Sequence, residues 1–439
     1  MSRPRASTGP RTAARRGSPG LLAGLAALGA GLALPGATAA RRGSPGLLAG
    51  LAALGAVLAL PGATAAPEAP SPFDRETPPG VEGPEQVPGA RPADSGRLGD
   101  EPADPELERL FRPPPDAPRL LALRRGLAHL AASQAATGDG SFPRGEGEGL
   151  EFAPVAITAL GSLALMSGGS TPTQGPHHEA VTRAIDYLLL HTDLSPASPT
   201  RGFISAGGDE TSLMHGHGFA TLALAEAYGM SPRNARLRTA LEAAIDLVQR
   251  TQGAQGGWYY KPERQSEHEG SLTVCMVQAL RAAREAGLRV DPEVIRRADG
   301  YLERSQVEDG SFAYQIGSPR TSVALTAAAI SSLNATGQYS GTAIAKGVDA
   351  IWRDLAEREA EGGRARFPYY ERLYLAQAFW QHQDTTHFQR WFDDEVQGVL
   401  RAQDQDGSWF DGRFGTSYAT AMNCLVLAMP DSLLPAFQR

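Results

Sequence analysis

Lysine is almost absent from this chain. Of its 41 basic residues only Lys261 and Lys346 are lysines, and the formal net charge at pH 7 is -7. A protein that binds nucleic acid usually presents a clustered positive face, which this composition does not favour. The sequence therefore predicts no nucleic-acid partner.

The amino-terminal region lacks an apolar run long enough to cross a bilayer, which takes about 20 residues. Instead, a segment that begins at Arg15 is repeated from Arg41, and the two copies differ only at Gly31 and Val57. Each copy has a basic start, an apolar run and a small-residue end, as in a secretory signal peptide. We expect residues 1–66 to be a duplicated signal segment of a protein exported to the periplasm, cell surface or medium. A retained anchor is the alternative, and no cysteine is present for a lipid anchor.

The next segment, residues 67–118, has almost no aromatic residues. It holds 14 of the 33 prolines, many acidic residues and Gly, and only Phe73 and Phe111 as large apolar rings. Such a segment buries too little apolar area to offset the entropy lost on ordering. We expect a disordered linker, followed by one folded domain over residues 119–439.

An internal repeat organises that domain. In residues 297–312 an apolar helix ends near Gln306, Gly310 breaks it and Phe312 follows the break, and a second helix then begins that is rich in small residues. The same order recurs six times, which identifies a repeat architecture. The second helices are expected at residues 154–166, 215–228, 271–283, 321–333, 374–382 and 418–429.

Six helical hairpins predict an all-α fold, an (α/α)6 toroid that encloses a central cavity. Helices of small residues suit the inner ring, where backbones approach closely, and amphipathic helices suit the outer ring. The Gln and Gly-aromatic elements are expected to join neighbouring hairpins and to have no ligand role. Cys275 and Cys424, on second helices at opposite sides of such a ring, are expected to be buried free thiols.

The turns resemble the QW motif of squalene cyclases and other terpene cyclases. Residues 252–258 and 403–409 match its Gln, Gly and Trp spacing, and residues 297–312 match throughout except that Phe312 replaces Trp. The chain thus resembles the prenyltransferase and squalene-oxidase repeat proteins of the terpenoid cyclase and protein prenyltransferase superfamily. This resemblance implies an α/α toroid, here of an exported, bacterial type.

The catalytic motifs that the resemblance implies are missing. The Asp-x-Asp-Asp run that protonates an alkene is absent, residues 393–395 stop short of Asp-Asp-x-x-Asp, and Thr273 stands where the zinc-binding Asp-x-Cys motif would place Asp before Cys275. Aromatic residues, which stabilise carbocations, are only 7% and look scarce on the inner helices. We therefore expect no cyclase chemistry, no metal and no cofactor. A zinc site formed by His215, His217 and an acid of a neighbouring repeat is the alternative, which no short-spaced ligand motif supports.

Polar residues gather where each outer helix turns into its inner helix, at the end of a toroid that admits ligands. His215 and His217 begin one inner helix, and Glu269 of the next repeat is placed to orient them; these three are the catalytic candidates if the protein is an enzyme. A helix cap or a solvated loop residue is the alternative at each position. The expected ligand-binding residues are His215, His217, His268, Glu269, Arg320, Tyr370, Glu371, Tyr374, Arg413 and Tyr418.

We expect the toroid to bind an apolar, isoprenoid, lipid or polymeric ligand in its cavity, with a possible association with the cell envelope. One alternative is a divergent isoprenoid- or glycan-processing enzyme that uses the histidines and acids at the cavity entrance. A purely structural envelope scaffold is the other. The sequence does not decide among them, because a repeat that joins hairpins carries no chemistry.

Overall fold

The computed structural model describes residues 118–144, 150–209, 212–431 and 433–438. These residues form twelve α-helices, two short 3-10 helices and four isolated β-bridges, with no strand among them. The predicted signal segment and all of the predicted linker except Pro118 lie outside the described residues. No helix within the described ranges is long and apolar enough to be a membrane span.

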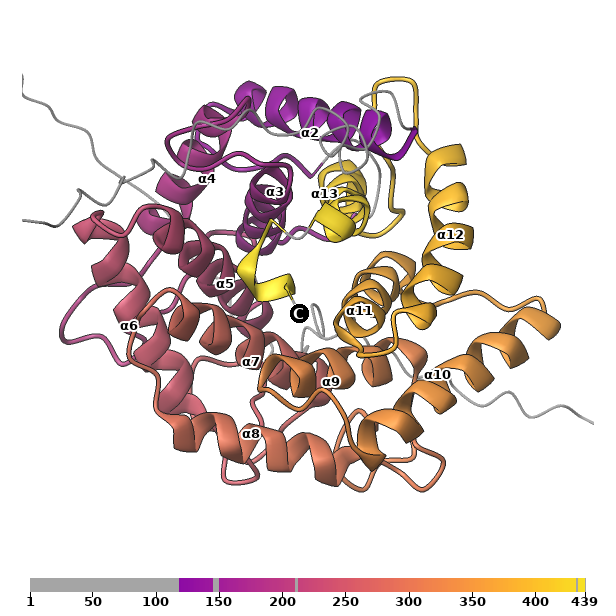
Figure 1. The fold of residues 1–439 in the computed structure, drawn as a ribbon. Helices are drawn as coiled ribbons and strands as arrows, with labels where there is room; N and C mark the ends of the chain where they lie inside the picture. Colours follow the sequence, from indigo (N-terminus) through magenta and orange to yellow (C-terminus); the bar gives the residue numbers. More distant parts are fainter. Residues whose placement is uncertain (1–117, 145–149, 210–211, 432, 439) are drawn as a thin grey trace, which may run out of the picture. The chain divides into compact units, whose positions relative to one another are not determined.

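The helices alternate between an outer and an inner ring (Figure 1). The outer helices are α2 (Pro118–Thr137), α4 (His178–Leu190), α6 (Ala235–Thr251), α8 (Pro292–Ser305), α10 (Thr342–Ala360) and α12 (Thr386–Arg401). The inner helices are α3 (Pro154–Ser167), α5 (Met214–Met230), α7 (Gly270–Glu285), α9 (Val323–Ala335), α11 (Pro368–Gln381) and α13 (Gly415–Ala428).

The inner ring is closed. Each inner helix contacts the two beside it, from α3 through α5, α7, α9 and α11 to α13, and α13 contacts α3 again. Every residue of α3 is buried, whereas α8 buries only one face. The predicted (α/α)6 toroid is confirmed. We call the end at which the inner helices begin the mouth and the end at which they finish the floor.

Glutamines join neighbouring hairpins. Gln252 Nε2 donates 2.8 Å hydrogen bonds to the carbonyl oxygens of Gly256, in its own turn, and Val294, in the next outer helix. Gln403 makes the same pair of bonds and so ties the last hairpin to the first, at Ala122. Gln134 and Gln306 repeat the arrangement. The structural role predicted for these glutamines is confirmed.

In two of these turns the aromatic residue is a Trp that is hydrogen-bonded within its own hairpin. Trp409 is 1% exposed, and its indole nitrogen donates to the Val399 carbonyl at 2.8 Å. Trp258 binds the Val248 carbonyl in the same way at 2.7 Å. These rings are therefore parts of the core and lie away from any ligand.

One inner helix begins earlier than the sequence indicated. Helix α11 starts at Pro368, six residues before the expected start, and Pro at the first position suits a helix because its missing N–H has no partner there. Tyr374 therefore lies about two turns inside the ring and not at its mouth. The other inner helices match their expected ranges within a few residues.

Both cysteines are free and buried, as predicted. Cys275 lies on α7 and Cys424 on α13, and burial raises the pKa of both thiols above the ordinary value. Neither thiol is therefore poised to react.

Candidate functional site

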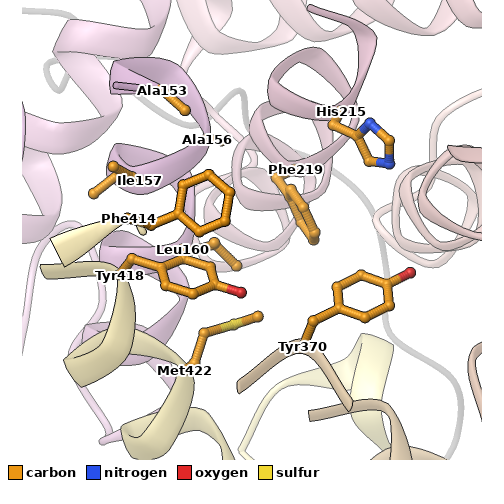
Figure 2. Close-up of a pocket in the computed structure, with 10 residues that line it drawn as sticks. All are labelled: Ala153, Ala156, Ile157, Leu160, His215, Phe219, Tyr370, Phe414, Tyr418 and Met422. Atoms are coloured by element: carbon orange, nitrogen blue, oxygen red, sulfur yellow. The ribbon is translucent and has the colours of Figure 1, made fainter. Parts of the chain in front are cut away.

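A small cavity lies at the mouth, between the first halves of α3, α5, α11 and α13 (Figure 2). Its free volume is about 10 Å³, which is room for roughly one water molecule. Its wall is formed by Ala153, Ala156, Ile157, Leu160, His215, Phe219, Tyr370, Phe414, Tyr418 and Met422.

Four aromatic rings dominate this wall. Phe219 and Tyr370 face Phe414 and Tyr418 across the cavity, and the rings of Phe414 and Tyr418 have centroids 4.9 Å apart. The expectation that the inner helices offer few aromatics to the cavity is therefore wrong. The total is low, but the rings near the helix starts are concentrated around this one space.

His215 is the nitrogen-bearing side chain of the wall. Its Nε2 atom lies 3.3 Å from Ser271 Oγ and 3.7 Å from Glu269 Oε1, while Nδ1 has no hydrogen-bond partner among the described residues. The residue just before α5, Leu213, has φ 44°, a left-handed conformation that strains a branched side chain. The chain thus enters α5 through a strained turn that places His215 at the cavity.

Glu269 stands behind His215 and caps α7. Its carboxylate accepts hydrogen bonds from the backbone N–H groups of Ser271 and Leu272, at 2.9 and 2.7 Å, and from the Ser271 hydroxyl. A carboxylate at a helix N-terminus is stabilised by the unpaired amides and the helix dipole. Glu269 therefore has a structural role as well as a position next to the cavity wall.

Burial leaves this pair with little charge at neutral pH. It lowers the pKa of His215 to about 3, so the imidazole is neutral, and it raises the pKa of Glu269 to about 7 against the hydrogen bonds from Ser271 and Leu272. Between about pH 3 and pH 7 the imidazole of His215 is therefore neutral and Glu269 behind it is mostly protonated, which suits an apolar occupant.

Tyrosines surround the pair on the side away from the cavity. The ring of Tyr260 lies 6.0 Å from that of His215, and the hydroxyl groups of Tyr260 and Tyr314 are hydrogen-bonded to each other. Burial, and then the charge of Glu269, raise the pKa of both phenols above the ordinary value. They act as neutral hydrogen-bonding groups.

The arrangement is not that of an acyl-transfer triad. In such a triad the acid binds the histidine nitrogen opposite the serine, whereas here Glu269 binds Ser271 itself and His215 Nδ1 has no acid among the described residues. Across the described ranges no group of three His, Cys, Asp or Glu side chains is placed to hold a metal ion.

His217 and His268 lie away from this cavity. His217 is fully buried, packs against Phe203 with ring centroids 5.7 Å apart, and accepts the Ile204 N–H at Nδ1 over 3.3 Å. His268 Nδ1 lies 3.1 Å from the Tyr301 hydroxyl. The structure therefore brings Glu269 to His215 but not to His217.

The charged residues expected at the mouth contact other side chains there and do not line the cavity. Glu371 is paired with Arg358 through two hydrogen bonds of 2.6 and 3.0 Å. Arg413 binds Glu151 at 2.5 Å. The exposed Arg320 lies over the ring of Tyr314, at 4.8 Å from its centroid.

Of the remaining expected residues, Tyr370 and Tyr418 line the cavity and Tyr374 lies below it. The Tyr374 hydroxyl donates to Gln278 Oε1 at 3.3 Å, within a buried polar cluster. The Tyr370 hydroxyl is buried without a partner among the described residues.

The sequence did not indicate Phe219, Phe414 or Met422 as part of the site. All three sit in or beside apolar inner helices and have the pattern of core residues. Their only sequence signal is position, since each falls within the first two turns of an inner helix or just before it.

Comparisons with known proteins show the fold of this chain and not its activity. No protein-family model matches the chain, and no curated protein matches it. Among solved structures, an inactive variant of the α-1,6-mannanase GH76A of Salegentibacter sp. HEL1_6, in complex with α-1,6-mannotetrose, has 10% identity and a TM-score of 0.51, over 70% of this chain and 97% of that one.

A second similar structure is the type II terpene cyclase MstE from Scytonema. It has 17% identity and a TM-score of 0.48, over 72% of this chain and 99% of that one. At these identities the likeness concerns only the α/α toroid, which hosts unrelated chemistries.

Proposed function

We propose that this protein binds an apolar ligand of the isoprenoid class in the cavity at the mouth. The observation that carries this proposal is the wall, in which four aromatic rings and aliphatic side chains meet and the nitrogen-bearing side chain, His215, is neutral above about pH 3. Aromatic faces and aliphatic groups bury an isoprenoid chain without leaving polar groups unpaired.

The ligand must widen the cavity as it enters. About 10 Å³ does not hold an isoprene unit, so the side chains of Phe219 and Tyr370 have to rotate outward. Such rotations are side-chain events that leave the helices in place. Binding is therefore expected to be slower than for an open cleft.

Binding is favoured over alkene protonation. That reaction needs a strong acid aimed at the substrate, whereas burial makes Glu269 a weaker acid than an ordinary carboxyl, and Glu269 does not line the cavity. A glycan is a poorer fit, because sugar hydroxyl groups would face apolar side chains without hydrogen-bond partners.

The finer assignment to the squalene-cyclase and prenyltransferase repeat proteins, and export from the cell, belong to this proposal. The Gln-Gly-aromatic turns and their shared hydrogen bonds support the first. The repeated basic and apolar segment supports the second. Fractionation of the host cell, with detection of the amino terminus of the mature chain, tests export directly.

Equilibrium dialysis with radiolabelled farnesol and geranylgeraniol tests binding. In Ala156→Phe a ring fills the cavity, and we expect at least about tenfold weaker binding. Ala286→Phe is the matched control, because Ala286 lies at the opposite end of the ring. The proposal fails if the unaltered chain binds neither alcohol, or if Ala156→Phe binds as well while its circular dichroism is unchanged.

An enzyme acting on the same ligand is the second candidate, favoured by the place of His215 between the cavity and Glu269. Incubation with geranylgeraniol and mass-spectrometric analysis of products would reveal turnover. His215→Gln and Glu269→Gln are expected to abolish it, whereas His217→Gln, equally buried but away from the cavity, should retain it. Absence of any product in the unaltered chain leaves binding as the function.

A further inference from the structure

The floor of the ring is filled by a segment that follows the last repeat. Residues 433–438 lie over the middle of the ring, beside the end marked C in Figure 1, and include the 3-10 helix η4 (Pro435–Phe437), which contacts α7. The side chains of Leu434 and Phe437 are 2% and 5% exposed. The segment is thus packed into the floor even though no repeat predicts it.

Two side chains of the ring hold the backbone of this segment. Glu226 of α5 accepts the Ala436 N–H at Oε1 over 2.9 Å, and Gln381 of α11 donates to the Gln438 carbonyl oxygen over 3.3 Å. One acceptor for an N–H, one donor for a carbonyl and recesses for two apolar side chains form the usual elements of a peptide-binding site.

The packing beside the segment is incomplete. A cavity of about 270 Å³ remains between the segment and the ends of α5 and α7. It is lined by Ala225, Glu226, Gly229, Met230, Ala282, Glu285, Ala286, Leu433 and Pro435. This cavity is partly open to solvent, since Leu433 is 49% exposed and Pro435 is also exposed, so the segment has fewer packing partners on this side than a core element.

Ionisation of the buried Glu226 weakens the attachment of the segment. Burial raises its pKa to about 7, Glu285 of α7 adds to the rise, and the Ala436 N–H and Arg281 of α7 oppose it. Residues 433–438 themselves carry no charged side chain. If the segment leaves, water reaches Glu226 and its pKa returns toward 4.5, so attachment weakens as the pH rises from about 4.5 to 7.

A buried polar cluster leads from this floor toward the mouth. Gln381, which holds Gln438, lies within 3.4 Å of Ser331, and Ser331 is bonded to Gln377 at 3.0 Å. Gln377 accepts from Gln278 at 2.6 Å, and Tyr374 donates to Gln278 one turn below the cavity residue Tyr370. Opening the floor would expose the lower end of this polar cluster.

We propose that residues 433–438 are a detachable plug, and that the floor which they fill is a binding site for a short apolar peptide that turns as η4 does. The geometry that supports this is the pair of backbone contacts, the two buried side chains and the unfilled cavity beside them. The plug does not depend on the function proposed for the mouth, and its test uses no isoprenoid.

Thiol labelling of the full chain tests the plug. Ala225→Cys places a thiol in the floor cavity, and the native thiols are buried, so the rate of reaction with N-ethylmaleimide reports opening. Adding Phe437→Ala should speed labelling at least tenfold, while Phe410→Ala, which removes a half-exposed ring far from the floor cavity, should change it less than twofold. Equal rates with and without Phe437→Ala would overturn the proposal, as would labelling of the unaltered plug at the rate of the denatured chain.

A synthetic peptide with the sequence of residues 433–438 tests the binding site. Added in excess to the Ala225→Cys, Phe437→Ala chain, it should slow labelling, and the same peptide with Ala at the position of Phe437 should not. If neither peptide slows labelling, the floor does not bind a short apolar peptide.

Glu226→Gln separates the charge effect. Glutamine still accepts the Ala436 N–H and has no carboxyl to ionise, so at pH 8 labelling should be slower by roughly 10- to 100-fold. A faster rate would contradict the charge argument.

Hydrogen exchange of the unaltered chain covers the case in which Phe437→Ala does not fold. The amides of Ala436 and Gln438 should exchange well before those of α7. Exchange of both only on global unfolding would show that the segment is an ordinary part of the core.

Discussion

The two ends of the ring are closed by different means. At the mouth, residues of the inner helices themselves, such as Phe219 and Phe414, fill the space until room for roughly one water molecule remains. At the floor, a segment outside the repeats closes the ring and leaves a cavity of about 270 Å³. The mouth therefore opens only by rotation of side chains, whereas the floor can open by departure of a whole segment.

The largest expected effect comes from a residue on which both ends depend. Trp409→Ala removes a buried ring and its hydrogen bond to Val399, which should lower the free energy of unfolding by about 3–5 kcal/mol. Urea denaturation measures this cost. Farnesol binding at the mouth and protection of the Ala225→Cys thiol at the floor should weaken together. Loss of only one of them would show that the two ends do not depend on the same core.

A Phe→Ala substitution should lower the free energy of unfolding more at the mouth than at the floor. Phe414→Ala, at the mouth, is expected to lower the free energy of unfolding by about 3 kcal/mol, because the ring belongs to the core. Phe437→Ala, at the floor, should cost about 1–2 kcal/mol, because the plug can leave while the ring stays folded. If urea titrations give the same loss of unfolding free energy for the two variants, the two ends do not differ in this way.

Acid should destabilise the mouth through its buried histidines. The pKa of His215 and His217 is about 3 in the folded chain and near 6.5 once exposed, so the unfolded chain takes up protons first. The contribution of these two histidines to stability, present above pH 6.5, is lost as the pH falls from 6.5 to 3, by a few kcal/mol. Glu269 and Glu226, whose pKa burial raises from 4.5 to about 7, oppose this loss between pH 7 and 4.5, so the net destabilisation is expected mainly below pH 4.5.

The check on this prediction is the urea midpoint as a function of pH. His217→Gln should flatten the acid side of that curve without changing farnesol binding at pH 7. His215→Gln should flatten it and alter binding, since only His215 lines the cavity. An unchanged acid side in both variants would contradict the burial argument.

The smallest effect is expected at an exposed ring. Phe410 is 49% exposed, and Phe410→Ala should change the free energy of unfolding by less than about 0.5 kcal/mol. Thermal melting would detect a larger change, which would mean that this ring packs against something at the mouth.

Sequence reasoning reached the fold because its signals are local. A helix of small residues recurs in each hairpin, and a Gln at a helix end with a Gly four residues on recurs in four of the six; the hydrogen bonds of Gln252 and Gln403 show why. It placed His215, Tyr370 and Tyr418, which line the cavity, because polar and aromatic residues at helix starts are visible in the chain.

The cavity residues and the floor segment that the sequence did not predict depend on contacts between residues far apart in the chain. Phe219 and Phe414 have the sequence pattern of core residues, and only the closed ring brings them to one space. The bond between Ala436 and Glu226 joins residues 210 positions apart, and no periodicity predicts it. Helix α11 starts earlier than predicted because Phe367 and Pro368 suit a loop as well as the start of a helix.

The bond from Gln403 to Ala122 has a consequence for how the ring unfolds. An open stack of repeats has end units that contact one neighbour and fray first. Here the Gln403 side chain ties the last hairpin to the first, as Gln134, Gln252 and Gln306 tie three other neighbouring pairs. The ring of hairpins therefore has no terminal unit. To leave, a hairpin must break two interfaces at once, and the toroid is therefore expected to unfold with higher cooperativity than a linear array of the same hairpins.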